Sequence, residues 1–330
     1  MTRRTGPLRL DRRFQQLRVG AFEHFAAGDY EKVLPAALAA EGEYPEKGEV
    51  PFWIACVYGA TGRPRAALEA LRTGLARGLY WPDDWLLEDD DLAPVRADTG
   101  FAAVVAESAR LRTLTEKAAT PPAAVTLPAW TGGTRAATST SPRAIAVTLH
   151  GWGQTAEEHA AEWIGVAAAG VAVVAPESAQ EPTPGFFVWD DRAAARAAVA
   201  AQVRRALGRL HAGEAPLVLA GFSQGGGLAI DLALDGDPLQ AAAGLALSSG
   251  AEDLEAPPTT PRLRAATGRG LRIRLVAGER DAALPGARGL AAALAGAGID
   301  CPLLVVPGAG HEMPSPESGL LLGEVEALLA

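Results

Sequence analysis

The sequence is poor in cysteine, in uninterrupted apolar runs and in positive charge, and each shortage excludes a class of protein. Its two cysteines, Cys56 and Cys301, lie far apart and offer no disulfide framework, so we expect a reducing, cytoplasmic setting. No stretch reaches the roughly 18 uncharged apolar residues of a membrane-spanning helix, and the charged N-terminus lacks the apolar segment of a secretory signal. With 30 basic against 39 acidic residues, the net charge of −9 argues against nucleic acid or an anionic membrane as a partner.

What remains is the composition of an ordinary globular protein. Hydrophobic residues make up 48% of the chain and charged residues 21%, which is enough apolar material for a substantial core. The 330 residues amount to about twice the usual length of a domain. The sequence therefore predicts two domains.

The first domain is expected to be helical. Residues 10–117 contain no strand-like runs, and their apolar side chains recur at helical spacing. Two glycine turns, at Gly28 and Gly62, lie 34 residues apart, and each precedes a second helix. A helix-turn-helix period of this length is typical of tetratricopeptide repeats, which bind protein partners. Residues 1–118 therefore resemble a short tetratricopeptide-like array, with a plain helical bundle as the alternative.

A boundary between domains is expected within residues 119–142. The run Thr120–Ala124 contains two prolines and is typical of a linker. The segments Val125–Trp130 and Thr134–Ala137 flank a Gly-Gly pair and predict a hairpin that opens a sheet. Residues 143–330 then form the second domain.

Ser223 is the most informative residue of that second domain. It lies in Gly221-Phe222-Ser223-Gln224-Gly225, after an apolar segment of strand length and before a segment with a helical pattern. This strand-turn-helix context predicts a nucleophile elbow, in which the serine occupies a strained turn and small neighbours let strand and helix approach. An ordinary turn is the alternative.

Two later residues can activate that serine. A serine hydroxyl is a weak nucleophile unless a base takes its proton and a third group orients the base. Asp281 follows an apolar strand at 271–278, and His311 follows another at 301–306, in the order that such hydrolases use. Glu279 competes with Asp281 for the acid role because it lies two residues away.

Stabilising the oxyanion of acyl transfer requires backbone N–H donors. The N–H of Gln224, next to the nucleophile, is one. The second is expected in the glycine-rich loop 150–154, from Trp152 or, as second choice, Gly151. The same loop fits a G-x-G-x-x-A dinucleotide pattern, with Glu177 at the end of the next strand. That alternative accounts for none of the three residues that a serine hydrolase explains.

These motifs carry a family resemblance. Residues from about 144 to 330 resemble the α/β-hydrolase superfamily, and within it the phospholipase/carboxylesterase group that includes acyl-protein thioesterases. The matching stretches are Leu149–Gly153, Ala175–Ser178, Gly221–Gly226, Ala246–Gly250, Gly278–Asp281 and Gly310–His311. The resemblance implies a mostly parallel sheet with helices on both faces, and Ser223, Asp281 and His311 at its carboxyl edge.

The resemblance also implies a substrate class. It predicts cleavage of carboxylic esters or thioesters without metal or cofactor, and it places Trp189, with Phe187 beside it, in the substrate pocket. The short segment 181–187 and the run Ala282–Pro285 depart from the family pattern, which leaves the physiological substrate open.

The sequence thus predicts a tetratricopeptide-like domain followed by an α/β-hydrolase domain. In the predicted reaction an acyl-enzyme forms on Ser223, His311 acts as general base and acid, and Asp281 orients it. Two other classes remain as alternatives. One is an interaction protein that uses the hydrolase domain as a scaffold. The other, less favoured, is a nicotinamide-dependent oxidoreductase built on the Gly151 loop.

Overall fold

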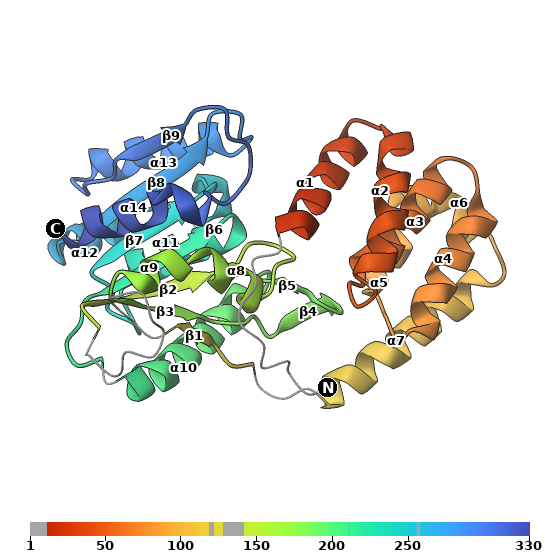
Figure 1. Cartoon of the computed structure of the whole chain (residues 1–330), viewed down its shortest axis with the longest axis horizontal. Coiled ribbons are helices and arrows are strands. Elements are labelled where there is room, and N and C mark those ends of the chain that lie inside the picture. The colour runs from red at the N-terminus through yellow and green to blue at the C-terminus, as the bar shows by residue number, and fades with distance from the viewer. Residues whose placement is uncertain (1–11, 119–121, 128–141, 211, 256–257) are drawn as a thin grey trace. The chain divides into compact units, whose positions relative to one another are not determined.

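The computed structural model describes residues 12–118, 122–127, 142–210, 212–255 and 258–330 (Figure 1). Contacts within the chain divide it into two compact units. The sheet unit contains Pro122–Gln180 and Val188–Ala330, and the helical unit contains residues 12–118 together with Glu181–Phe187.

The helical unit is built from helices joined by tight turns. Its elements are α1 (Arg12–Ala26), α2 (Tyr30–Glu43), α3 (Glu49–Ala60), α4 (Pro64–Ala76), α5 (Asp83–Glu88), η1 (Asp90–Leu92), α6 (Ala93–Arg96) and α7 (Phe101–Ala118). Gly28 and Gly62 end the turns inside the pairs α1–α2 and α3–α4, each with φ of 71°, which glycine adopts without strain. The two helix pairs therefore recur at the offset expected from the sequence, while their assignment to tetratricopeptide repeats stays a prediction.

The segment Glu181–Phe187 packs into the core of the helical unit. Gly48 donates its N–H to the carbonyl of Pro184 at 3.0 Å. Phe186 is 1% exposed, and its ring meets Trp85 edge-on at 5.4 Å between centroids. The guanidinium of Arg18 lies 5.6 Å from the centre of the Phe186 ring. This short segment is thus held by backbone and by aromatic contacts.

The described part of the sheet unit forms a seven-stranded sheet in the order β1-β3-β2-β6-β7-β8-β9. Its strands are β1 (Val125–Leu127), β2 (Ala144–Leu149), β3 (Val171–Ala175), β6 (Leu217–Phe222), β7 (Ala243–Leu247), β8 (Arg272–Gly278) and β9 (Leu303–Val306). Only β1, of the strands in this sheet, runs antiparallel to its neighbour, β3. The strands β4 (Gln180–Thr183) and β5 (Phe186–Val188) form a separate two-stranded sheet. This sheet includes the segment Glu181–Phe187 of the helical unit.

Helices cover both faces of the sheet (Figure 1). They are α8 (Ala156–Glu162), α9 (Ile164–Ala168), α10 (Arg192–Leu210), α11 (Gln224–Asp235), α12 (Thr260–Gly268), α13 (Leu284–Gly296) and α14 (Leu320–Leu329), with short turns η2 (Ala251–Asp253) and η3 (Pro316–Ser318). Alternate residues of β2 face two different cores, one shared with α10 to α13 and the other with α9 and α14. Strands buried on both faces read as continuous apolar runs, as β2, β3, β6 and β7 do.

The predicted fold class is confirmed: a mostly parallel α/β-hydrolase sheet with helices on both faces, accompanied by a small all-α part. Val125–Leu127 forms a strand that pairs with β3, and the second arm of the expected hairpin, Thr134–Ala137, lies outside the described residues. The division by contacts differs from the predicted boundaries in assigning Glu181–Phe187 to the helical unit. Among the described residues no helix combines the length and the apolar character that crossing a bilayer demands.

Gly48 tests the packing of the inserted segment. It has a helical backbone (φ −65°), so alanine is conformationally allowed, but an added Cβ would collide with Oγ1 of Thr183. We expect Gly48→Ala to lower the free energy of unfolding by about 1–3 kcal/mol, measured by urea titration. Gly42→Ala, where nothing lies within 4 Å, is the control and should be neutral or slightly stabilising. Adding Thr183→Ala should recover most of the loss, and equal stability of the Gly48 and Gly42 variants would contradict this packing.

Candidate active site

Ser223 occupies the strained turn between β6 and α11. Its φ of 52° lies in the region that side chains with a Cβ rarely adopt, and its N–H donates to Leu247 of β7 at 2.8 Å. A Cβ at Gly221 would collide with the carbonyl of Gly225, and one at Gly225 with the backbone at the end of β2. The glycines are therefore needed for strand and helix to approach, as the elbow motif predicts.

The structure brings Ser223, His311 and Asp281 together at the carboxyl ends of β6, β9 and β8. Nε2 of His311 lies 3.0 Å from Oγ of Ser223, and Nδ1 lies 2.9 Å from Oδ1 of Asp281. A carboxylate only accepts hydrogen bonds, so Nδ1 carries the proton and Nε2 presents a lone pair to the serine hydroxyl. The Asp281 side chain is fully buried, whereas that of His311 is 40% exposed.

Asp281 is held in its ionised form. Burial by itself raises the pKa of a carboxyl group, but hydrogen bonding from His311, from the Ser248 hydroxyl and from the Ala283 N–H outweighs it. The pKa of Asp281 therefore lies below its usual value of 3.8. A permanent negative charge at neutral pH suits a group that orients an imidazole.

Glu279, the competing acid, has another partner. Its carboxylate accepts the N–H of Gly308 at 2.9 Å, in the loop that leads to His311. This contact ties the end of β8 to the end of β9. The geometry favours Asp281 over Glu279 as the partner of His311.

The loop after β2 lies beside the elbow, because β2 and β6 are neighbours in the sheet. The N–H of Gly151 donates to Oε1 of Gln154 at 2.7 Å, so the second-choice oxyanion donor is engaged inside the loop. Trp152 follows, with its side chain 38% exposed. On the other side, the N–H of Gln224 is the first of α11, and the first N–H groups of a helix have no acceptor within it.

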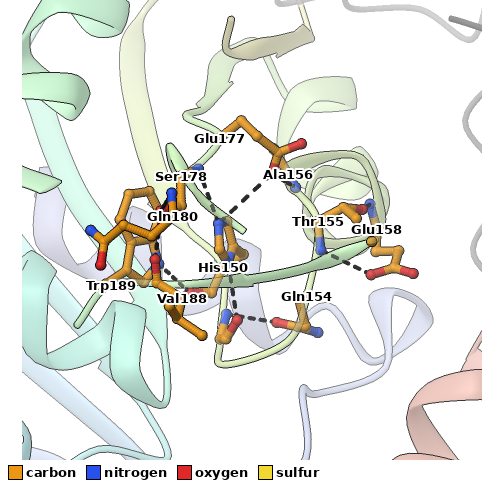
Figure 2. Close-up of polar contacts among 12 residues, drawn as sticks. His150, Gln154, Thr155, Ala156, Glu158, Glu177, Ser178, Gln180, Val188 and Trp189 are labelled. Carbon is orange, nitrogen blue, oxygen red and sulfur yellow. Dashed lines mark hydrogen bonds and ion pairs between the residues drawn. The ribbon is translucent and has the colours of Figure 1, made fainter. Parts of the chain in front are cut away.

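His150 anchors this loop (Figure 2). The imidazole is fully buried, and Nδ1 donates to the carbonyl of Gly151 at 2.9 Å. Nε2 faces the N–H of Ser178 at 3.4 Å and Oε1 of Glu177 at 3.8 Å. Glu177 in turn accepts the N–H of Ala156 at 2.7 Å. The carboxylate that a dinucleotide-binding site would aim at a ribose therefore caps the start of α8.

The two expected pocket residues lie in different units. Trp189 belongs to the sheet unit and is 0% exposed, while Phe187 is half-buried in the helical unit. Sequence reasoning missed the side-chain role of Gln224. Its Oε1 accepts the backbone N–H of Trp189 at 2.8 Å, and its Nε2 donates to Oδ1 of Asp190 at 2.6 Å. No spacing rule in the sequence could have paired these residues.

A second buried histidine supports β2 from α8. Nε2 of His159 lies 2.6 Å from Oγ1 of Thr148, and within the described residues Nδ1 has no hydrogen-bond partner. Burial lowers the pKa of His159 from 6.5 to about 3. The imidazole is therefore neutral in the folded protein throughout the physiological range.

Comparison with protein-family models and with curated proteins finds no match. Among solved structures, an uncharacterized protein from Bacillus cereus ATCC 10987 has a TM-score of 0.51 at 17% identity, covering 96% of this chain and 98% of that one. Esterase PE8 has a TM-score of 0.49 at 21% identity, over 63% of this chain and all (100%) of that one. A carboxylesterase from Mesorhizobium loti has 0.46 at 21%, over 56% and 88%. The likeness to the Bacillus cereus protein extends over nearly the whole length of both chains, and it is a likeness of fold.

The buried, neutral His159 should make the folded protein less stable in acid. Between pH 6.5 and about 3 the unfolded chain binds a proton at this residue that the folded chain does not, so stability falls as pH falls through this window. Relative to pH 7.5, the loss at pH 5 amounts to about 2 kcal/mol. We expect His159→Gln to reduce the difference in unfolding free energy between these two pH values by about that amount in urea titrations. His24→Gln, at a partly exposed site, is the control, and a pH dependence equal in the two variants would contradict the prediction.

Proposed function

We propose that this chain is a serine hydrolase that cleaves carboxylic esters or thioesters through an acyl-enzyme on Ser223. The observation that carries the proposal is the continuous chain of contacts from hydroxyl to imidazole to carboxylate, 3.0 Å and then 2.9 Å long. The strained elbow supports it because it exposes the hydroxyl at the end of a central strand. Ester hydrolases among the structural neighbours agree with this class of reaction.

In the proposed reaction, Nε2 of His311 takes the proton of the Ser223 hydroxyl while Oγ attacks the carbonyl carbon. The carbonyl oxygen becomes an oxyanion, stabilised by the N–H groups of Gln224 and Trp152. Asp281 stabilises the imidazolium. When the tetrahedral intermediate collapses, the bond to the leaving group breaks, and His311 returns its proton to that alcohol or thiol.

Deacylation repeats these steps with water. His311 removes a proton from a water molecule, whose oxygen attacks the acyl carbon. Collapse of the second tetrahedral intermediate releases the carboxylic acid and returns the proton to Ser223. The partial exposure of the His311 side chain supports this step because the imidazole borders solvent.

Ser223→Ala tests the nucleophile. Removing Oγ leaves no atom to carry the acyl group, so we expect hydrolysis of a short p-nitrophenyl ester to fall by about 10⁴-fold or more. Labelling by a fluorophosphonate should disappear with it. Ser318→Ala, which changes an exposed serine of η3, should retain both activities. A wild-type protein that neither turns over nor labels would favour the scaffold alternative.

Asp281→Asn separates the two candidate acids. The amide can donate a hydrogen bond to His311 and select the wrong tautomer, so we expect kcat to fall by about 10²–10⁴-fold with little change in KM. Glu279→Gln should keep kcat within about threefold, since its contact is with Gly308. A larger loss in the Glu279 variant would transfer the acid role to that residue. Steady-state kinetics on the same ester decide between them.

A further inference from the structure

The two proposed oxyanion donors lie after different strands. One buried residue, Trp189, forms hydrogen bonds to both segments that carry them. Gln224 follows β6, whereas Trp152 belongs to the loop after β2. The backbone N–H of Trp189 donates to the side chain of Gln224 at 2.8 Å. Its indole N–H donates to the carbonyl of His150 at 2.9 Å (Figure 2). Trp189 thus cross-links two arms of the site: the loop after β2, here called the β2 arm, and the start of α11 after β6, here called the β6 arm.

On the β2 arm, the cross-link continues to the Trp152 N–H through a single peptide plane. The imidazole of His150 stacks on the Trp189 ring, with 4.5 Å between centroids and 29° between planes. Its Nδ1 holds the carbonyl of Gly151. That carbonyl and the N–H of Trp152 belong to the same planar trans peptide and point in opposite directions. Holding the Gly151 oxygen therefore fixes the direction of the Trp152 N–H.

On the β6 arm, the Gln224 side chain is held at both ends. Its oxygen accepts from Trp189, and its nitrogen donates to Asp190. Arg192, two residues further on, donates to the backbone carbonyl of Gln224 at 3.3 Å and to that of Asp253 at 2.8 Å. The first turn of α11 is thereby tied to the segment 189–192.

We propose that Trp189 is a positioning residue that sets the direction of both oxyanion donors, in place of lining the substrate pocket. The proposal rests on the proposed function of the Ser223 site. Complete burial of Trp189 supports it, because a ring that is 0% exposed has no surface left for a substrate. Donors that are fixed before the reaction cost no reorganisation when charge develops on the carbonyl oxygen.

Loss of the Trp189 cross-link should be visible in the kinetics. Misdirected donors weaken binding of the tetrahedral transition state, whereas a ground-state carbonyl oxygen carries little charge and interacts weakly with them. Loss of the cross-link should therefore lower kcat and leave KM nearly unchanged. The pH profile of kcat should also keep its wild-type shape, since neither the imidazole of His311 nor Asp281 is altered.

Trp189→Phe removes the indole N–H while keeping an aromatic ring and the backbone N–H. We expect kcat on a short p-nitrophenyl ester to fall about 10–100-fold, since small misplacements at a reacting centre have effects of this size. KM should stay within about threefold, and the rate of fluorophosphonate labelling should fall in parallel with kcat, because the phosphoryl oxygen enters the same hole.

Trp163→Phe is the matched control. Trp163 is also 0% exposed and lies in the sheet unit, but its indole N–H has no hydrogen-bond partner within the described residues. The substitution deletes the same atoms from a buried site without breaking a hydrogen bond. Its kcat should equal that of the wild type. Circular dichroism and urea titration establish that both variants are folded.

Gln224→Met provides a second, independent variant. It removes both side-chain hydrogen bonds and keeps the backbone N–H that stabilises the oxyanion. If the two residues act through one cross-link, the kcat loss of the double variant Trp189→Phe/Gln224→Met should be smaller than the product of the single losses.

If the wild type is active, any of three results for Trp189→Phe would overturn the proposal. They are a kcat equal to that of Trp163→Phe, an effect on KM alone, and a pH profile shifted from that of the wild type. A wild-type protein without turnover or labelling would instead remove the proposed function itself.

Discussion

The close contact of strand β6 with helix α11 is the constraint on which the rest of the site depends. Because Gly221 and Gly225 touch backbone to backbone, Ser223 is forced to a positive φ. A helix begins at the next residue, which leaves the N–H of Gln224 without an acceptor inside that helix. One steric contact thus sets both the nucleophile and the first oxyanion donor.

The same edge of the sheet is held by a ladder of hydrogen bonds that steps from strand to strand. The backbone N–H of Ser223 donates to Leu247 at the end of β7, that of Ser248 to Val276 near the end of β8, and that of Glu279 to Val306 at the end of β9. Each donor directly follows the last residue of its own strand: Ser223 follows β6, Ser248 follows β7 and Glu279 follows β8. The loops that carry Asp281 and His311 therefore start from fixed points, although they are far apart in the sequence.

Much of the site could be predicted because chain order and strand order agree in this half of the sheet. From β6 to β9 each strand neighbours its successor, so residues that follow successive strands meet at one edge. The pairing of Val125–Leu127 with β3 could not be predicted, since apolar spacing indicates a strand without indicating its neighbour. The same holds for Trp189, whose aromatic character fits a pocket wall and a buried cross-link equally well.

The glycine-rich loop after β2 shows how one pattern can serve two purposes. A Cβ at Gly151 would lie 2.7 Å from the ring of Phe222, so this glycine is needed for packing against the elbow. The acidic residue that completes the dinucleotide pattern, Glu177, accepts the N–H of Ala156. Both features of the competing motif thus have a structural use in this fold.

Because the helical unit contains Glu181–Phe187 as well as residues 12–118, cutting the chain at one point cannot separate the two units. A fragment that begins after residue 121 would keep Gly185 and Phe186 but lose the side chain of Lys47, which contacts Gly185, and those of Arg18 and Trp85, which contact Phe186. Its newly uncovered aromatic ring would favour self-association. Recombination that exchanges the helical unit must therefore move two separate pieces of the gene at once.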